Sequence, residues 1–521
     1  MSSLILRGAV PNDGLSPSQL LSMKPDEARL LFGKATKPFS VVAQVDDSWV
    51  VATDHLGMEP LFYARSGSNK WVVAETVEEI LRAPPHSETP LDEASIVGHI
   101  AGPYAPRPGS TFFAGVHAVI PGTLVRLTPE GSEETSYWEP LANGVDRSMT
   151  LAQAATKLRR LLFEVVPEYL SGTPVAVTLS SGMDSTTVLA ALVESKADVL
   201  AVAWTSPDIP EADEAAWARL TAAKLGVPLV ELAVTTGSLL PEAGIVTHRS
   251  TPLFNVFDHM WSAMSQKAAE KSRQVLFTGF SGDHLFGGWV SAAVDSLLEL
   301  RPIHTARYLF RSRPRYPNLL RALRTELLSP LARQAATGAW ARRQSPVPWL
   351  HPEYRNLWLE RQVETLGPGL RPGRAERLSG LSDGLISQLA EDMTIQTQPY
   401  GVELRHPFLD RRLVEFALSL PSWMLNDGNT DKLVLRQAMR GILPDEVVEL
   451  ENILPGPIAR QAIRARADPI LALTRDMHAA DLGFVSEPVL AQHVAGFMRE
   501  EHDDMSFWNT LTLEDWLRRF W

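Results

Sequence analysis

The strongest constraint on the fold is an alternation of short apolar runs and helical segments in the middle of the chain. Short runs made up mainly of apolar residues are typical of strands that a sheet buries on both faces. The runs that predict such strands are residues 175–179, 199–204, 229–234 and 274–278. Helical periodicity occupies the stretches beside them, at residues 151–170, 185–195 and 212–225. Strands and helices that alternate at this spacing predict a doubly wound parallel sheet.

The part of the chain before this region is β-rich by pattern, with apolar runs separated by short turns. The runs that predict these strands are residues 39–45, 49–53, 61–64, 71–74 and the two halves of 116–127 around Ile120-Pro121-Gly122. Residues 140–150 have the composition of a linker, and the pattern from about Pro302 onward is mainly helical. We therefore predict an α/β chain of two domains, residues 1–145 and 150–521, the second ending in a helical tail.

Charge and cysteine content limit the classes of function. The chain has 521 residues, a net charge of −12 at pH 7 and no cysteine. The acidic balance disfavours long contacts with nucleic-acid phosphates, and no apolar run is long enough for a bilayer span or a secretory signal. Without cysteine, disulfides, thiolate metal sites and thiol nucleophiles are excluded. We expect a soluble cytoplasmic enzyme with neither nucleic acid nor a membrane as a partner.

The sequence LSSGMDSTT at residues 179–187 lies between a predicted strand and a predicted helix. Small residues let the backbone fold closely around an anion, and the N–H groups of the first helical turn then point at a phosphate. The hydroxyls of Ser180 and Ser185 add two donors. No lysine follows Gly182, so this is not the GxxxxGK[ST] loop. The pattern suits a pyrophosphate held as a leaving group, with an ordinary serine-rich turn as the alternative.

A second glycine-rich stretch, FTGFSGDHLFGG at residues 277–288, follows another predicted strand. It places Asp283 at the same edge of the sheet as Asp184, because the carboxyl ends of parallel strands share one edge. Two carboxylates at neighbouring strand ends can hold one Mg²⁺ against a triphosphate. The alternative for Asp283 is a solvated turn.

These stretches resemble the motifs of a known family. SSGMDS resembles the SGGxDS pyrophosphate loop of the asparagine-synthetase superfamily, and TGFSGDHLFGG resembles its SGxGxDExFGG motif. ELRHPFLD at residues 403–410 looks like its E-x-R-x-PFLD motif, and TDKLVLR at 430–436 looks like the helix that follows. The motifs occur in the family's order and spacing over about residues 150–450.

The resemblance implies a PP-loop (HUP-type) amide ligase that uses ATP and Mg²⁺. It implies metal binding by Asp184 and Asp283. The residues that it assigns to the nucleotide are Leu179, Ser180, Ser181, Gly182, Asp184, Ser185, Thr186, Ala203, Gly279, Ser281 and Gly282.

The front domain resembles the family's N-terminal-nucleophile (Ntn) glutaminase domain. TDHLGMEPLFY at residues 53–63 is similar to its D-x-x-G-x-x-P-L-Y stretch, and Pro121-Gly122 and Tyr137-Trp138 are similar to its end. The family's nucleophilic cysteine is missing, position 2 is Ser2, and the domain is shorter than its relatives by many tens of residues. We therefore expect a degenerate, truncated domain that serves as a scaffold. A serine nucleophile is the alternative.

A ligase that cannot use glutamine takes ammonia or an amine of its own substrate. Relatives of the second kind are β-lactam synthetases, carbapenam synthetases and the macrolactam cyclases of lasso peptides. The tail segment DLGFV at residues 481–485 resembles the ends of such cyclases. The favoured prediction is a lasso-type macrolactam cyclase acting on a precursor peptide, together with a protease and a recognition protein. The alternatives are a β-lactam-type synthetase with a small amino-acid-like substrate, and an ammonia-dependent asparagine synthetase.

Two departures from the family concern the amide-forming step. His284 replaces the family's glutamate after the metal aspartate, and we predict that it acts as the base, with a loop hydrogen bond as the alternative. Asn452 stands where relatives carry a lysine, and Lys432, Arg436 or Arg460 are the candidates to supply the missing charge. Asn452, and Ser181 where relatives have glycine, also keep open a non-catalytic nucleotide-binding relative.

Overall fold

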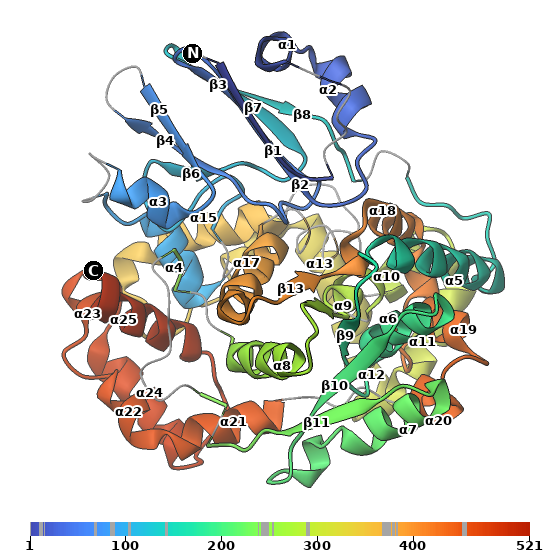
Figure 1. Cartoon of the computed structure of the whole chain (residues 1–521). Coiled ribbons are helices and arrows are strands. Elements are labelled where there is room, and N and C mark those ends of the chain that lie inside the picture. Colours follow the sequence, from blue (N-terminus) through green and yellow to red (C-terminus); the bar gives the residue numbers. More distant parts are fainter. Residues whose placement is uncertain are drawn as a thin grey trace.

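The structure is a computed structural model of the whole chain (Figure 1). It describes residues 2–9, 14, 16–66, 70–83, 89–102, 106–140, 144–237, 239–240, 250–252, 255–287, 292–366, 377, 381, 384–450 and 456–521. Within these residues, no helix combines the length and the apolar character that crossing a bilayer requires.

The front domain consists of two antiparallel sheets. The first has the order β1 (Ser2–Gly8), β2 (Phe39–Val45), β3 (Ser48–Thr53), β7 (Thr123–Thr128), β8 (Gly131–Ser136). The second has the order β5 (Lys70–Ala74), β4 (Phe62–Ser66), β6 (Val116–Ala118). The helices are α1 (Pro17–Ser22), α2 (Pro25–Phe32), α3 (Val77–Arg82) and α4 (Glu93–Ala101). Val51, Tyr63 and Val125 belong to one apolar cluster that joins the two sheets.

The part of the chain that follows the front domain contains the parallel sheet that the sequence predicts. Its order is β11 (Leu229–Ala233), β10 (Val199–Thr205), β9 (Val175–Thr178), β12 (Val275–Phe277), β13 (Glu403–Arg405), and all four pairings are parallel. The chain builds outward from β9 to β11 and then returns to the other side of β9 with β12. The doubly wound order is therefore confirmed, and the point where the order reverses lies between β9 and β12.

Helices cover both faces of this sheet, which explains why its three central strands, β9, β10 and β12, are almost entirely apolar. Val175 and Val177 pack in one apolar cluster with the helices of one face, whereas Ala176 belongs to a different cluster on the other face. The helices around the sheet are α5 (Leu151–Glu168), α6 (Met183–Glu194), α7 (Ala215–Leu225), α8 (Asp258–Glu270), α9 (Gly282–Phe286), α17 (Leu385–Thr397), α18 (Arg411–Ser419), α19 (Leu433–Met439) and α20 (Asp445–Glu449).

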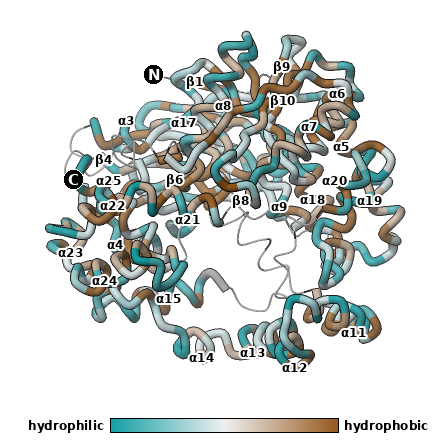
Figure 2. The backbone as a smooth tube through the Cα atoms, turned by 90° about the horizontal axis from the view of Figure 1, so that it is seen from below, coloured by the Kyte–Doolittle hydropathy of each residue, from teal (hydrophilic) through white to brown (hydrophobic). Residues whose placement is uncertain are grey.

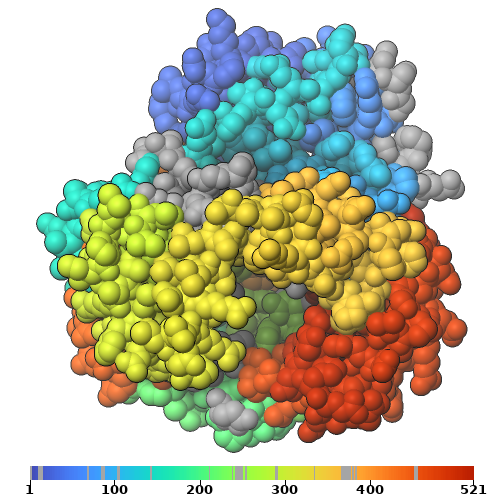
Figure 3. Space-filling view, turned by 180° about the vertical axis from the view of Figure 1, so that it is seen from behind, coloured from blue at the N-terminus to red at the C-terminus, as the bar shows by residue number. Residues whose placement is uncertain are grey.

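The remaining helices form two further bodies. One group projects along an edge of the molecule in Figure 2 and consists of α10 (Ala292–Leu298), α11 (Pro302–Arg311), α12 (Leu319–Leu323), α13 (Ser329–Ala335) and α14 (Thr337–Ala341). The C-terminal tail consists of α21 (Gly456–Ala465), α22 (Ala467–Ala472), α23 (His478–Asp481), α24 (Glu487–Met498) and α25 (Trp508–Phe520), and α15 (Arg355–Leu366) precedes it. Figure 3 shows a hollow between these two bodies.

The front domain packs directly on the rest of the chain. His55 Nε2 lies 3.0 Å from the carbonyl oxygen of Leu409, and the Trp138 indole N–H donates to Glu415 of α18 at 3.0 Å. On the opposite side, His99 of α4 lies 3.1 Å from the Thr512 hydroxyl of α25. These contacts hold the front domain above the sheet, as Figure 1 shows.

Candidate active site

The loop after β9 folds back on itself through its own serines. The Ser180 and Ser185 hydroxyl oxygens are 2.8 Å apart, and the Ser180 N–H donates to Ser185 Oγ at 3.1 Å. The Gly182 N–H donates to Ser180 Oγ at 3.1 Å, and Gly182 is the N-cap of α6. The hydroxyls that the sequence assigned to phosphate binding therefore lie together at the N-terminus of a buried helix.

Glu214 is a residue of this loop region that the sequence did not single out. Its buried carboxylate accepts the Ser181 N–H at 2.7 Å, and burial raises its pKa, although the Ser181 N–H opposes the shift. It precedes α7, so the contact ties the tip of the β9 loop to the neighbouring strand–helix connection. The clue in the sequence was the acidic pair Asp213-Glu214 just before a helix, a common N-cap position.

The loop after β12 packs against the β9 loop so closely that only glycine fits at two positions. A Cβ on Gly279 would lie 2.5 Å from the Ser185 nitrogen, and one on Gly282 would lie 2.2 Å from Asp184 Cγ. Ser281 between them has a φ of 69°, in the left-handed region. The two predicted motifs therefore form one compact unit at the switch point of the sheet.

Lys432 lies between the two aspartates. Its Nζ is 2.7 Å from Asp184 Oδ2 and 2.6 Å from Asp283 Oδ1. Burial lowers the pKa of Lys432, but the two carboxylates outweigh burial and hold its pKa above the usual value. Burial raises the pKa of Asp184 to about 6, although the ammonium opposes that shift. The two carboxylates are thus close enough to share one cation.

The backbone at Lys432 is bent to place this ammonium. Its φ of 51° lies in the left-handed region, which costs a side-chain-bearing residue roughly 1–2 kcal/mol. The side chain is 2% exposed and both ion pairs are short, so loss of either carboxylate would leave the buried ammonium with less compensating charge. Lys432 directly precedes α19. The sequence made it a candidate to supply the positive charge missing at position 452, and did not predict that it joins Asp184 to Asp283.

The donor set also suits a divalent cation. Asp184 Oδ1 is buried and has no hydrogen-bond partner, and carboxylate oxygens are the ligands that Mg²⁺ prefers. Within the described residues there is no cluster of three or more His, Cys, Asp or Glu side chains that would hold a metal by protein ligands alone. Mg²⁺ at this place would need phosphate or water oxygens in addition to Asp184 and Asp283. The sequence prediction named only the two carboxylates, and the structure adds Lys432 to them.

His284 lies on α9, directly after Asp283. Its Nδ1 is buried without a hydrogen-bond partner, and burial lowers its pKa, so the ring is neutral near pH 7. Its ring contacts the edge of Phe280 at a centroid distance of 6.4 Å. A neutral imidazole whose ring nitrogen has no hydrogen-bond partner is able to accept a proton, as the base hypothesis requires.

Of the other predicted residues, three nucleotide-binding candidates lie at or beside the β9 loop, and Arg436 has a structural contact instead. Leu179 is buried at the end of β9, Thr186 lies in the first turn of α6, and Ala203 lies on the adjacent β10. Arg436 of α19 donates to the carbonyl oxygens of Val448 and Leu450 and to Asp431, so its guanidinium holds the backbone before residue 451.

Arg460 is not brought to the strand ends. It lies on α21 in the C-terminal tail, where its Nε is 3.7 Å from Asp503, and α21 is separated from β9 in Figure 1. Asn452, which stands where relatives carry a lysine, lies outside the described residues.

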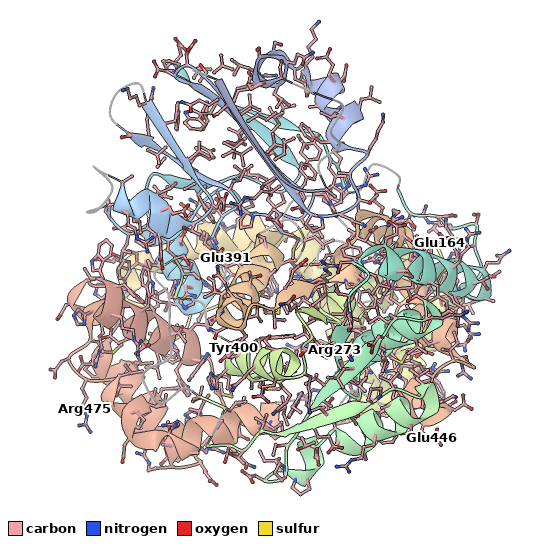
Figure 4. All side chains as sticks on the ribbon, viewed as in Figure 1. Glu164, Arg273, Glu391, Tyr400, Glu446 and Arg475 are labelled. Carbon is pink, nitrogen blue, oxygen red and sulfur yellow. The ribbon has the colours of Figure 1, made fainter. Side chains whose placement is uncertain are left out.

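A cavity of about 920 Å³ lies between the front domain and the parallel sheet. Arg7 and Glu59 line it from the front domain, and Glu391 and His406 line it from the other side. Figure 4 shows Glu391 on α17, beneath the front domain. His406 Nδ1 lies 2.7 Å from the Thr278 hydroxyl in the second loop, so one wall of the cavity contacts the site directly.

Comparison with known proteins agrees with this arrangement. The model of the family described as asparagine synthase matches residues 157–518, which is more than half of the chain. This chain belongs to the asparagine synthase family. A second family model, described as glutamine amidotransferase domain, matches residues 37–138, which lie within the front domain. The fold class that the sequence predicted is therefore confirmed.

Curated relatives are distant. Asparagine synthetase [glutamine-hydrolyzing] 3 of Bacillus subtilis (strain 168) is 23% identical over 424 residues, covering 76% of this chain and 63% of its own. Asparagine synthetase [glutamine-hydrolyzing] 1 of the same organism is 23% identical and covers 78% and 65%. Amidase chyE of Penicillium rubens is 24% identical and covers 66% and 58%. The chain thus spans less than two thirds of the length of these relatives.

Among solved structures, a glutamine phosphoribosylpyrophosphate amidotransferase from B. subtilis is similar at 12% identity. It covers 44% of this chain and 45% of its own length, with a TM-score of 0.17. A TM-score this low carries no argument about function or domain arrangement.

Proposed function

We propose that this member of the asparagine synthase family is an ATP-dependent ligase, forming AMP and pyrophosphate, that closes an intramolecular amide in a peptide. The observation that carries the ligase part is the cluster at the switch point, where Lys432 joins Asp184 to Asp283 beside the Ser180–Ser185 hydroxyl pair. These groups bring donors, a fixed positive charge and two carboxylates to one edge of the sheet.

The residues have distinct roles in this proposal. The serine hydroxyls of the β9 loop and the N–H groups of the first turn of α6 bind the pyrophosphate portion of ATP while a substrate carboxylate attacks the α-phosphorus. Lys432 neutralises charge that develops on the leaving pyrophosphate. Asp184 and Asp283 would hold Mg²⁺, which would supply further neutralisation of the phosphates. In the second step an amine attacks the activated carbonyl, His284 accepts its proton, and AMP leaves.

The amine comes from the substrate in this proposal rather than from glutamine. The chain has no cysteine, so the front domain lacks the thiol of a glutaminase. Strand β1 pairs with β2 so that Ser2 lies opposite Val45, beside the turn at the outer end of the sheet. Gly8, at the other end of β1, lines the interdomain cavity. The placement of Ser2 therefore gives no support to a serine nucleophile at that cavity.

A peptide substrate is favoured by the space around the site. The interdomain cavity of about 920 Å³ has the size of a site for a large ligand and contacts the second loop through His406. Figure 3 shows a further hollow beside the C-terminal helices, on the face seen from behind. We propose a precursor peptide as substrate, and a protease and a recognition protein of the same pathway as partners.

The test uses synthetic peptides that carry a free N-terminal amine and an internal Asp or Glu. The enzyme should convert ATP to AMP and pyrophosphate and release a product lighter by one water, measured by mass spectrometry. The matched control is the same peptide with an acetylated N-terminus. It should still support ATP–pyrophosphate exchange but should not lose water, because its carboxylate is free and its amine is blocked.

The same assay distinguishes the alternatives. Exchange with small amino-acid-like acids and none with peptides would favour a β-lactam-type synthetase. Asparagine formation from aspartate and ammonium would favour an ammonia-dependent asparagine synthetase, the activity closest to the names of the bacterial relatives. Nucleotide binding without exchange for any acid would mean a non-catalytic relative, and the proposal would fail.

A further inference from the structure

One segment of the chain concentrates exposed apolar side chains. We define the arm as residues 297–343, which run from the end of α10 through α14 (Figure 2). Among the described residues, the four most exposed large hydrophobic side chains all belong to it. They are Leu300 at 89%, Ile303 at 81%, Leu320 at 77% and Phe310 at 67%. Side chains of this size are normally buried, so such a concentration marks an interaction surface.

The arm is also strongly basic within an acidic chain. Residues 297–343 contain ten arginines, no lysine and two glutamates, whereas the whole chain has a net charge of −12. The two glutamates already have partners, since Glu299 pairs with Arg147 and Glu326 accepts hydrogen bonds from Tyr308 and Tyr316. The arm therefore carries an excess of positive charge, although the net charge of the whole chain is negative.

The apolar and basic side chains alternate along the arm instead of lying in one pocket. On α11, Ile303, Arg307 and Phe310 lie at positions i, i+4 and i+7, which share one helix face. Further along, Leu320 neighbours Arg321, and Arg324 follows within one turn. These arginines are exposed, and within the described chain no ion pair with a carboxylate joins Arg307, Arg321 or Arg324.

The arm is fixed to the body of the protein, so its surface has a defined orientation. Arg311 pairs with Asp427 at 2.9 Å, and the Arg315 guanidinium donates to the carbonyl oxygen of Asn429 at 2.9 Å. A Cβ on Gly428 would lie 2.3 Å from the Tyr308 carbonyl oxygen, so the arm and this loop are in close backbone contact. Leu300, Ile303 and Leu320 remain exposed on the arm held in this way.

We infer that the arm binds the surface of a bilayer containing anionic lipids. Anionic headgroups pair with the arginines, and the boundary of the acyl chains accepts leucine, isoleucine and phenylalanine at the same time. Nucleic acid would use the arginines but leave the apolar side chains in water. A folded acidic protein would need a fixed pattern of pockets to match side chains spread over successive helices. The expectation that the chain has no membrane partner rested on the lack of an apolar run long enough to span a bilayer, and contact with the bilayer surface needs no such run.

Vesicle flotation tests this inference with the full chain. Vesicles of phosphatidylcholine mixed equally with phosphatidylglycerol should carry the protein upward, whereas pure phosphatidylcholine vesicles should bind it at least about tenfold more weakly. High salt should release the protein, because surface charge interactions are screened. The double variant Ile303→Ser with Phe310→Ser and the double variant Arg321→Gln with Arg324→Gln should each weaken binding about tenfold or more.

Matched controls come from equally exposed residues elsewhere. Leu30→Ser on α2 (66% exposed) and Arg160→Gln on α5 (side chain 72% exposed) should leave flotation unchanged. All variants should keep the thermal unfolding midpoint and ATP binding of the parent, because the changed side chains are on the surface. Equal loss in control and arm variants would overturn the inference. Absence of vesicle binding, together with arm-dependent binding of polyglutamate or DNA, would also overturn it and assign the arm to a polyanion.

Discussion

At the scale of single residues, the site depends on a buried ammonium held by two carboxylates. Removing one partner of such a group leaves charge in a low-dielectric environment without compensation, which typically costs several kcal/mol. In the proposed mechanism Asp184 and Asp283 also hold Mg²⁺, a role that a neutral amide cannot fill, because Mg²⁺ prefers carboxylate oxygen. The same two side chains thus position Lys432 and provide for a metal.

Asp184→Asn and Asp283→Asn should each abolish adenylation, measured as ATP–pyrophosphate exchange. A fall of about 100-fold or more is expected, because either change removes a carboxylate from both the metal and Lys432. Glu164→Gln, an exposed acid on α5 (side chain 57% exposed), is the control and should retain full exchange. Exchange retained in both aspartate variants would remove the metal assignment.

The pH dependence of adenylation follows from the raised pKa of Asp184. Burial lifts this pKa from 3.8 to about 6, so the carboxylate becomes neutral as the pH falls through about 6. Exchange activity should decline over that window, about two pH units above where an ordinary aspartate would cause the decline. The stability effect has the opposite sign: the folded state holds this proton more tightly, so Asp184 contributes less stability as the pH rises from about 4 to 6. A profile flat down to pH 5 would contradict the assignment.

His284→Ala should spare adenylation and slow amide formation. In the proposed mechanism the imidazole accepts the proton of the attacking amine after pyrophosphate has left, and loss of a general base costs typically 10²–10⁴-fold. Rapid-quench measurement of the two steps separates them. An equal fall in the rates of both steps would mean that His284 only supports the loop through a local contact.

At the scale of elements, the site is two strand–loop–helix units packed tip to tip. Both loops were recognisable from glycines and serines after apolar runs, and the structure shows that neighbouring strands β9 and β12 carry them. The glycines at 279 and 282 are needed because the backbone of one loop contacts Asp184 and Ser185 of the other. That reason was not available from the sequence, since it depends on contact between distant segments.

Gly282→Ala should therefore reduce ATP–pyrophosphate exchange about 100-fold or more, because the added methyl group meets Asp184 Cγ at 2.2 Å and must displace a metal ligand. The matched control is Gly131→Ala in the front domain, where a Cβ would meet nothing within 4 Å. Full exchange in Gly282→Ala would show that the two loops do not pack as the structure places them.

Some elements could not be predicted because their stability comes from packing rather than from local pattern. Strand β13 has only three residues, Glu403–Arg405, and it exists because β12 pairs with it along the sheet edge. The sequence predicted a turn at Ile120-Pro121-Gly122 between two strands, and the structure has both strands, but β6 pairs with β4 and β7 pairs with β3 in different sheets. A turn predicts where the chain bends, but not which strand it will meet.

At the scale of the whole molecule, the front domain packs on the synthetase part through buried side chains such as His55 and His99. Such contacts fit a domain that is kept for support. Added glutamine should yield no glutamate above the uncatalysed rate, measured with an enzyme-coupled assay, because no thiol is present. Glutamate release that survives Ser2→Ala would point to an unrecognised nucleophile, and release that Ser2→Ala abolishes would revive the serine alternative.

The sequence by itself determined the parallel sheet, the two glycine-rich loops and the family, because apolar periodicity and local backbone needs are written in neighbouring residues. Only the tertiary structure decided that Lys432 joins Asp184 to Asp283, that Glu214 holds the Ser181 N–H, and that Arg460 pairs with Asp503 in the tail. These contacts join residues far apart in the chain. Their partners are selected by the packing of whole elements, which no local pattern records.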